Sequence, residues 1–215
     1  RWLEAHGVDA VIAQGVEVAF GVPGESYLPV LEGFHEHHDK IRFITCRQEG
    51  GAAFMAEAHG KLTGRPGVCL VTRGPGATNA AIGVHTAFQD STPMVLLVGD
   101  VGADFRHREA FQEIEYTSMF GPSTTGLAKR VERIDDATRI PEYISRAFAT
   151  AMNGRPGPVV LVLPEDMLHQ HVDARPLPRA QVSQAGLAPT AVRELDALLQ
   201  AAERPLVIAG GRWSP

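Results

Sequence analysis

Apolar runs bounded by glycine or proline are the feature that most constrains this fold. Three of them, Gly67–Thr72, Met94–Val98 and Val159–Leu163, show no alternation of polar and apolar residues. Strands of this kind are buried on both faces, as happens where helices cover both sides of a parallel sheet. Shorter strands are expected at 16–20, 41–45 and 127–134, and helices at 3–14, 26–38, 49–63 and 74–89 and from 141 onward. The alternation predicts an α/β fold: a doubly wound, mainly parallel sheet with helices on both faces.

Composition narrows the class of protein. The 215 residues are 44% apolar and 21% charged, as in an ordinary soluble globular protein. A formal net charge of -5 argues against a nucleic-acid or membrane-surface partner, and no apolar run reaches the roughly 18 residues of a membrane helix. Cys46 and Cys69 lie in apolar runs, which favours reduced core thiols in a cytoplasmic protein.

The alternation of apolar strands and helices stops after Leu163, which suggests a domain boundary. We expect a first domain over 1–170, a proline-rich linker over 171–189, and the truncated start of a central domain over 190–215, with a helix from 190 to 202 and a strand near 204–211. The chain starts at Arg1, inside an apparent helix and without a signal peptide. We therefore expect the true N-terminus to lie upstream.

Ligands of doubly wound folds bind beyond the carboxyl ends of the strands. Functional residues are therefore expected in the turns that leave strands toward that edge. These turns are Gly21–Glu25, Arg47–Gly51, Arg73–Asn79 and Gly99–Gly102. After the first of them, Ser26 is the expected cap of the following helix.

Glu49 is a carboxylate at the junction of an apolar run and a small-residue helix start. Gly50 and Gly51 follow it, so another backbone or a flat ligand can approach closely. If such a carboxyl is buried, its neutral form is favoured and its pKa rises, which suits proton transfer near neutral pH. The alternative is a surface glutamate stabilised by the helix dipole, and the local sequence leaves the two interpretations evenly balanced.

The stretch Gly74–Asn79 has the glycines of a phosphate-binding loop at a helix start. It lacks the Lys-Ser/Thr pair of a P-loop, and Asn79 stands where the dinucleotide fingerprint has its third glycine. A plain turn with a helix cap remains the alternative.

Six ordered motifs resemble the acetolactate synthase-like enzymes, which are thiamine-diphosphate-dependent decarboxylases and carboligases. They are Gly21–Gly24, Arg47–Ala52, Gly74–Asn79, Asp90–Pro93, Phe111–Glu113 and Gly154–Pro158. The resemblance covers about residues 1–170 and implies the N-terminal pyrimidine-binding domain of that family, with the thiamine-diphosphate-binding fold.

The resemblance also implies a mechanism. In the family, the glutamate matching Glu49 donates a hydrogen bond to the cofactor's pyrimidine and promotes the imino tautomer that removes the thiazolium proton. The activated cofactor attacks a 2-keto acid, carbon dioxide leaves, and the remaining acyl unit adds to an acceptor. By the same resemblance, the cofactor-binding residues are Glu49, Pro75, Asn79, Gln112 and Val22, the substrate pocket contains Gly24, Glu25, Phe111 and Lys129, and no metal ligand is expected.

The cofactors and partners follow from the resemblance as well. The family binds thiamine diphosphate with Mg²⁺ through a C-terminal domain whose Gly-Asp-Gly…Asn motif is not in these residues. Some relatives carry FAD in the central domain, so FAD is a candidate cofactor. The implied assembly is a homodimer or homotetramer, and the fragment alone is expected to be inactive.

The sequence departs from the acetolactate synthase pattern at several positions. Asp100 replaces a glutamine, Glu25 a glycine, Glu165 a lysine and Arg130 an aromatic residue, and 123–126 looks like a small insertion. These departures keep open a related thiamine-dependent lyase or decarboxylase, of the benzaldehyde lyase or benzoylformate decarboxylase type. A non-catalytic pyrimidine-domain subunit and a nucleotide-binding domain without thiamine chemistry stay open as well.

Overall fold

The computed structural model describes residues 3–121, 126–183 and 186–208. The chain divides into two compact units, residues 1–182 and 183–215. The second unit contains helix α8 (Pro189–Ala201). The strand expected near 204–211 is not formed over 204–208, and 209–211 lie outside the described residues. A strand needs a neighbour for its backbone N–H and C=O groups, and the described part of this unit offers none.

A parallel sheet forms the centre of the first unit and confirms the doubly wound fold. In the described residues its strands are β1 (Val18–Gly21), β2 (Arg42–Thr45), β3 (Gly67–Thr72), β4 (Met94–Asp100), β5 (Arg130–Arg133) and β6 (Pro158–Pro164). Their order is β2-β1-β3-β4-β6-β5, and every pairing is parallel. The apolar runs of the sequence are the buried strands β3, β4 and β6.

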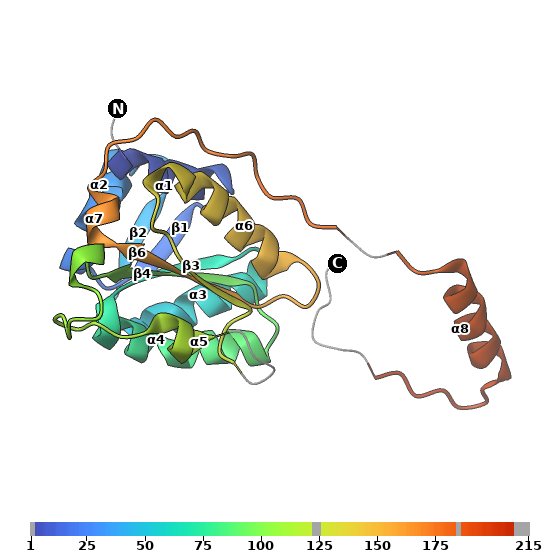
Figure 1. The fold of residues 1–215 in the computed structure, drawn as a ribbon. Helices are drawn as coiled ribbons and strands as arrows, with labels where there is room; N and C mark the ends of the chain where they lie inside the picture. Colours follow the sequence, from blue (N-terminus) through green and yellow to red (C-terminus); the bar gives the residue numbers. More distant parts are fainter. Residues whose placement is uncertain (1–2, 122–125, 184–185, 209–215) are drawn as a thin grey trace. The chain divides into compact units, whose positions relative to one another are not determined.

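Helices cover both faces of the sheet (Figure 1). One face carries α1 (Leu3–Ala13), α2 (Leu28–Glu36) and α6 (Ile140–Met152), and the other carries α3 (Glu49–Thr63), α4 (Arg73–Gln89) and α5 (Tyr116–Phe120). Each face of the sheet has its own hydrophobic core. The fully buried Leu161 belongs to the core under α1, α2 and α6, and the fully buried Leu96 to the core under α3, α4 and α5. Short helical segments complete the unit: 3-10 turns at Glu25–Tyr27, Ala103–Phe105 and Ala137–Arg139, and α7 (Glu165–Leu168).

The capping role expected for Ser26 is wrong. The α-helix begins two residues later, at Leu28, and Ser26 lies in the preceding 3-10 turn, fully buried. Its hydroxyl forms a 2.7 Å hydrogen bond with the hydroxyl of Thr72 at the end of β3. The Ser26 hydroxyl thus bonds to a residue distant in sequence instead of capping the helix that follows it.

The buried side chain of Gln14 fixes part of the expected linker within the first unit. Gln14, 5% exposed, donates through Nε2 to the carbonyls of Leu177 and Pro178, each at 3.3 Å. Its Oε1 accepts from the Ala180 amide at 2.8 Å. The amide side chain therefore takes the place of a neighbouring strand for this stretch of backbone.

The topology places the ligand crevice. The chain leaves β1 into α2 on one face and leaves β3 into α4 on the other, so the winding direction switches between β1 and β3. In such sheets the crevice opens at the carboxyl ends of the two strands that flank the switch.

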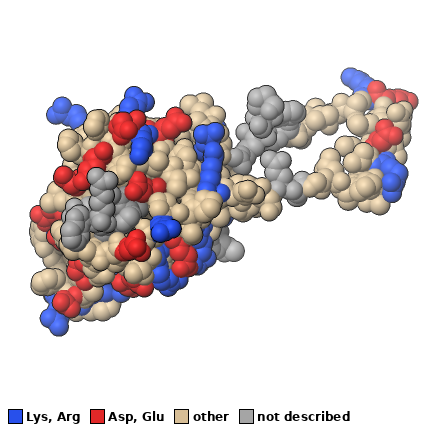
Figure 2. All heavy atoms as spheres, turned by 90° about the horizontal axis from the view of Figure 1, so that it is seen from above, with Lys and Arg blue, Asp and Glu red and all other residues tan. Residues whose placement is uncertain are grey.

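The surface bears charges of both signs. On the face seen in Figure 2, acidic and basic side chains are interspersed. Within the described ranges no helix combines the length and apolar character needed to span a membrane.

Candidate active site

Glu49 is the first residue of α3 and lies at the carboxyl edge of the sheet. The side chain of Gln48 accepts a 2.9 Å hydrogen bond from the Gly51 amide and caps the helix. The Glu49 side chain is free of that task and meets Asn79 of α4, whose Nδ2 donates to Glu49 Oε2 at 2.9 Å. Glu49 is half-buried in the single chain. The full burial that its apolar sequence neighbours suggested is therefore not reached.

Glycines bring α3 and α4 close enough for this contact. A Cβ at Gly83 would lie 2.5 Å from the Cβ of Ala53, and one at Gly50 would lie 3.2 Å from the carbonyl oxygen of Asn79. A Cβ at Gly51 would meet nothing within 4 Å. A close approach of another backbone was expected at the two glycines after Glu49. It is found at Gly50, which the backbone of α4 approaches. Gly51 leaves open space.

The buried Tyr27 fixes the turn after β1. The Tyr27 hydroxyl donates to the Val22 carbonyl. Burial raises the pKa of Tyr27, and the charge of the nearby Glu49 carboxylate acts in the same direction. The phenol therefore stays protonated and keeps its hydrogen bond to the carbonyl of Val22.

Gly24 and Glu25 lie against the end of β3. Gly24 packs so tightly on Thr72 that a Cβ there would collide with the threonine side chain. Glu25 Oε1 accepts a 2.7 Å charge-assisted hydrogen bond from Nη1 of Arg73. Sequence reasoning missed Arg73 because nothing local marks an arginine after a strand as buried, yet it is only 8% exposed.

Pro75, Phe111 and Gln112 reach the same edge from the other side. Pro75 is exposed in the first turn of α4. The preceding residue, Gly74, donates its amide to the Gln112 carbonyl at 2.9 Å, which ties the 106–115 loop to the start of α4. Gln112 adopts a left-handed conformation (φ 65°), and the neighbouring Phe111 ring is 73% exposed.

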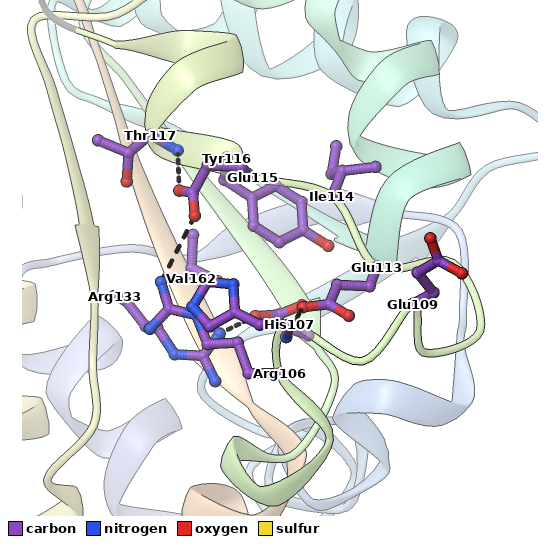
Figure 3. Close-up of a pocket in the computed structure, with 11 residues that line it drawn as sticks. Arg106, His107, Glu109, Glu113, Ile114, Glu115, Tyr116, Thr117, Arg133 and Val162 are labelled. Atoms are coloured by element: carbon purple, nitrogen blue, oxygen red, sulfur yellow. Dashed lines mark hydrogen bonds and ion pairs between the residues drawn. The ribbon is translucent and has the colours of Figure 1, made fainter.

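A cavity of about 320 Å³ lies beside this loop, over the ends of β4, β5 and β6 (Figure 3). Its wall includes Arg106, which forms a 3.5 Å ion pair with Glu115, and Arg133, which donates to the buried Asp100. Burial raises the pKa of Asp100, while the Arg133 charge acts in the opposite direction. Carboxylates outnumber the two arginines among the charged groups of the lining, which are Asp100, Glu109, Glu113, Glu115, Arg106 and Arg133.

Lys129 is not brought to this edge. It precedes β5 and therefore lies at the amino-terminal end of a parallel strand. Its ammonium group donates to the carbonyls of Thr150 and Asn153 at the C-terminus of α6. There it neutralises the negative end of the helix dipole. Within this chain the structure thus separates Lys129 from the other eight predicted site residues.

The assembled edge is suited to proton handling next to a flat ligand. It combines a carboxylate fixed by an amide and, on the neighbouring loop, an exposed aromatic ring. Among the described residues no group of three or more His, Cys, Asp or Glu side chains is placed to hold a metal ion. Of the small insertion expected at 123–126, residues 123–125 lie outside the described residues.

Comparisons with known proteins add to the geometry. A family profile described as "Thiamine pyrophosphate enzyme, N-terminal TPP binding domain" matches residues 1–119. A probable acetolactate synthase large subunit of Methanococcus aeolicus is 39% identical over 96% of this chain and 35% of its own length. An acetolactate synthase of Arthrospira platensis is 34% identical, and the acetolactate synthase isozyme 2 large subunit of Escherichia coli 32%, each over 95% of this chain and 36% of the relative. The chain thus spans about a third of the length of these curated relatives.

Proposed function

The chain belongs to the thiamine pyrophosphate enzymes, with their N-terminal TPP-binding domain over residues 1–119, and we propose on this premise that it is the N-terminal part of a thiamine-diphosphate-dependent 2-keto acid decarboxylase and carboligase. The similarity to acetolactate synthase large subunits supports this class. The observation that carries the proposal is the contact between Glu49 and Asn79 at the edge where ligands of this fold bind.

Glu49 is the proposed catalytic residue. Asn79 Nδ2 holds Oε2 of the carboxylate, and within the described residues Oε1 has no hydrogen-bond partner. That oxygen is available to exchange a proton with a ring nitrogen of the aminopyrimidine. Bound thiamine diphosphate supplies the nucleophilic carbon and accepts the electron pair left when carbon dioxide departs.

The residues present fit the pyrimidine end of such a cofactor. The Glu49 carboxylate, held by Asn79 at the carboxyl edge of the sheet, offers a partner for a ring nitrogen, and we assign Pro75, Asn79, Gln112 and Val22 to the surroundings of the ring. Gly24, Glu25 and Phe111 are assigned to the substrate pocket. Lys129 is left out, because it binds the end of α6.

The proposed assembly is a homodimer or homotetramer. Large apolar side chains of α3 and α4 are exposed: Phe54 40%, Met55 49%, Leu62 86% and Ile82 57%. Such a surface supports burial against a second subunit. A subunit that covers this region would also exclude water from the half-buried Glu49, which a proton-transferring carboxyl group requires.

The remaining cofactor requirements belong to the same proposal. Mg²⁺ and the diphosphate would be bound by a C-terminal domain, FAD is a candidate for the central domain, and these 215 residues alone would be inactive. A cytoplasmic location is supported by the two free thiols, Cys46 and Cys69.

The test is cofactor activation by the full-length protein with thiamine diphosphate and Mg²⁺. Glu49→Gln should slow exchange of the thiazolium C2 proton by about 10²–10⁴-fold, the usual range for general acid–base groups. Glu32→Gln, an exposed change on α2, is the matched control and should leave exchange unchanged. If Glu49→Gln exchanges the proton as fast as the wild type, the assigned role of Glu49 is contradicted. If the full-length protein decarboxylates none of a panel of 2-keto acids, the proposed function is contradicted.

A further inference from the structure

A buried arginine joins three strand ends at the candidate active site. Arg73, the first residue of α4 directly after β3, donates from Nη1 to Glu25 after β1 at 2.7 Å and from Nη2 to Glu165 after β6 at 3.0 Å. The two carboxylates are separated from Arg73 by 48 and 92 residues. Both are also positions at which the sequence departs from the acetolactate synthase pattern, so the two departures meet on one guanidinium.

The backbone holds this arginine at a cost. Arg73 has a left-handed conformation (φ 38°), which a non-glycine residue keeps only where its surroundings enforce it. The Glu25 turn is fixed beside it, because Ser26 bonds to Thr72 and Gly24 packs on the same threonine. Glu25 is therefore positioned at the carboxyl edge rather than free to swing in solvent.

The cation and the carboxylates of this cluster differ in exposure. The Arg73 side chain is 10% exposed, whereas that of Glu25 is 68% and that of Glu165 is 37% exposed. One positive charge faces two negative charges, and the positive charge is the buried one. An anion that arrives from solvent therefore meets the Glu25 carboxylate before it can reach the guanidinium.

We propose that Glu25, held in place by Arg73, is a specificity-determining residue that favours an uncharged acceptor carbonyl over an acceptor bearing a carboxylate. This inference rests on the proposed function and on the assignment of Glu25 to the substrate pocket. A fixed negative charge repels the carboxylate of any 2-keto acid, but the donor loses its carboxylate as carbon dioxide before the acceptor reacts. The charge therefore acts on the choice of acceptor, where it disfavours a second 2-keto acid and leaves an aldehyde unaffected. The chain would then differ in its acceptor from the acetolactate synthases that it resembles.

The favoured reaction balances without an oxidant or a reductant. A 2-keto acid anion, an aldehyde and one proton give a 2-hydroxy ketone and carbon dioxide. The bond between the keto carbon and the carboxylate breaks, and a bond forms between that keto carbon and the aldehyde carbon. The aldehyde oxygen takes the proton from solvent.

The experiment measures acceptor choice in the full-length enzyme with thiamine diphosphate and Mg²⁺. Pyruvate serves as the donor, and acetaldehyde competes with pyruvate as the acceptor. We expect the wild type to prefer the aldehyde by kcat/KM. Glu25→Gln should raise kcat/KM for the carboxylate-bearing acceptor about tenfold, or about 1.4 kcal/mol, and change that for the aldehyde less than about twofold.

Two matched variants and salt separate charge from structure. Glu25→Asp keeps the charge and should keep the aldehyde preference, and Glu32→Gln should change nothing. Because Glu25 is exposed, 0.5 M NaCl should weaken the preference of the wild type but not that of Glu25→Gln. Without cofactor, Glu25→Gln should also bind lactate, a carboxylate that does not react, about tenfold more tightly than the wild type in an NMR titration.

The outcomes distinguish this inference from the proposed function. If pyruvate is decarboxylated but Glu25→Gln leaves the acceptor ratio and lactate binding unchanged, the role of Glu25 is refuted and the proposed function stands. A wild type that prefers pyruvate as the acceptor refutes it as well. If no 2-keto acid is decarboxylated, both proposals are overturned.

Discussion

Substitution of Gly83 by alanine tests how closely α3 and α4 must pack. The new Cβ would lie 2.5 Å from the Cβ of Ala53 and 2.9 Å from its carbonyl carbon. Carbon atoms pack at about 3.5–4.0 Å, so the helices would have to part locally by roughly 1 Å. The obstacle is backbone and a Cβ atom, neither of which can rotate away.

The magnitude follows from two opposing effects. Overpacking of this kind costs about 1–3 kcal/mol, while alanine gains up to about 1 kcal/mol over glycine in a helix. Gly83→Ala should therefore destabilise the protein by roughly 1–2 kcal/mol. Gly51→Ala is the matched control, because its Cβ meets nothing within 4 Å and only the gain in helix propensity, up to about 1 kcal/mol, remains.

Urea unfolding followed by circular dichroism measures the difference. We expect the two variants to differ by about 1–3 kcal/mol, which is the overpacking cost alone, because both gain the helix propensity of alanine. In thermal unfolding, each kcal/mol shifts Tm by about 2–4 °C for a chain of this size. Equal stability of Gly83→Ala and Gly51→Ala would show that the helices have room to spare and would refute the packing argument.

Two further predictions concern Lys129 and His59. Lys129→Met should lower the free energy of unfolding by about 1–3 kcal/mol, because two hydrogen bonds to carbonyls at the end of α6 are lost. The kcat/KM of the full-length enzyme should stay within about twofold of the wild type. A large loss of kcat/KM at unchanged stability would instead support a place for Lys129 in the substrate pocket. Burial lowers the pKa of His59, and the Arg65 charge acts in the same direction. The unfolded chain then binds the proton more readily, so this contribution to stability is present above about pH 6.5 and is lost as the pH falls below it. His59→Gln should make stability less dependent on pH between pH 7 and 5 in urea unfolding, and an unchanged slope would contradict this.

The sequence by itself determined the architecture. Apolar runs without alternation can be satisfied only between two layers of helices, so β3, β4 and β6 and the parallel winding follow from local pattern. Helix α3 begins and ends at the predicted residues, because small residues and a terminal glycine mark it locally. Parallel strands also share one carboxyl edge, which brought Glu49, Asn79 and the β1 turn to the same place.

Only the tertiary structure decided which side chains meet there. Asn79 bonds to Glu49 across 30 residues, and Arg73 collects Glu25 and Glu165 from distant strand ends. A single sequence carries no signal for such pairs, because each partner reads locally as an ordinary polar residue in a turn. Lys129 also shows that a single sequence does not determine which side chains reach the site. The strand expected from 127 begins at Arg130, and this shift places the lysine before the strand, at the edge of the sheet opposite the candidate site.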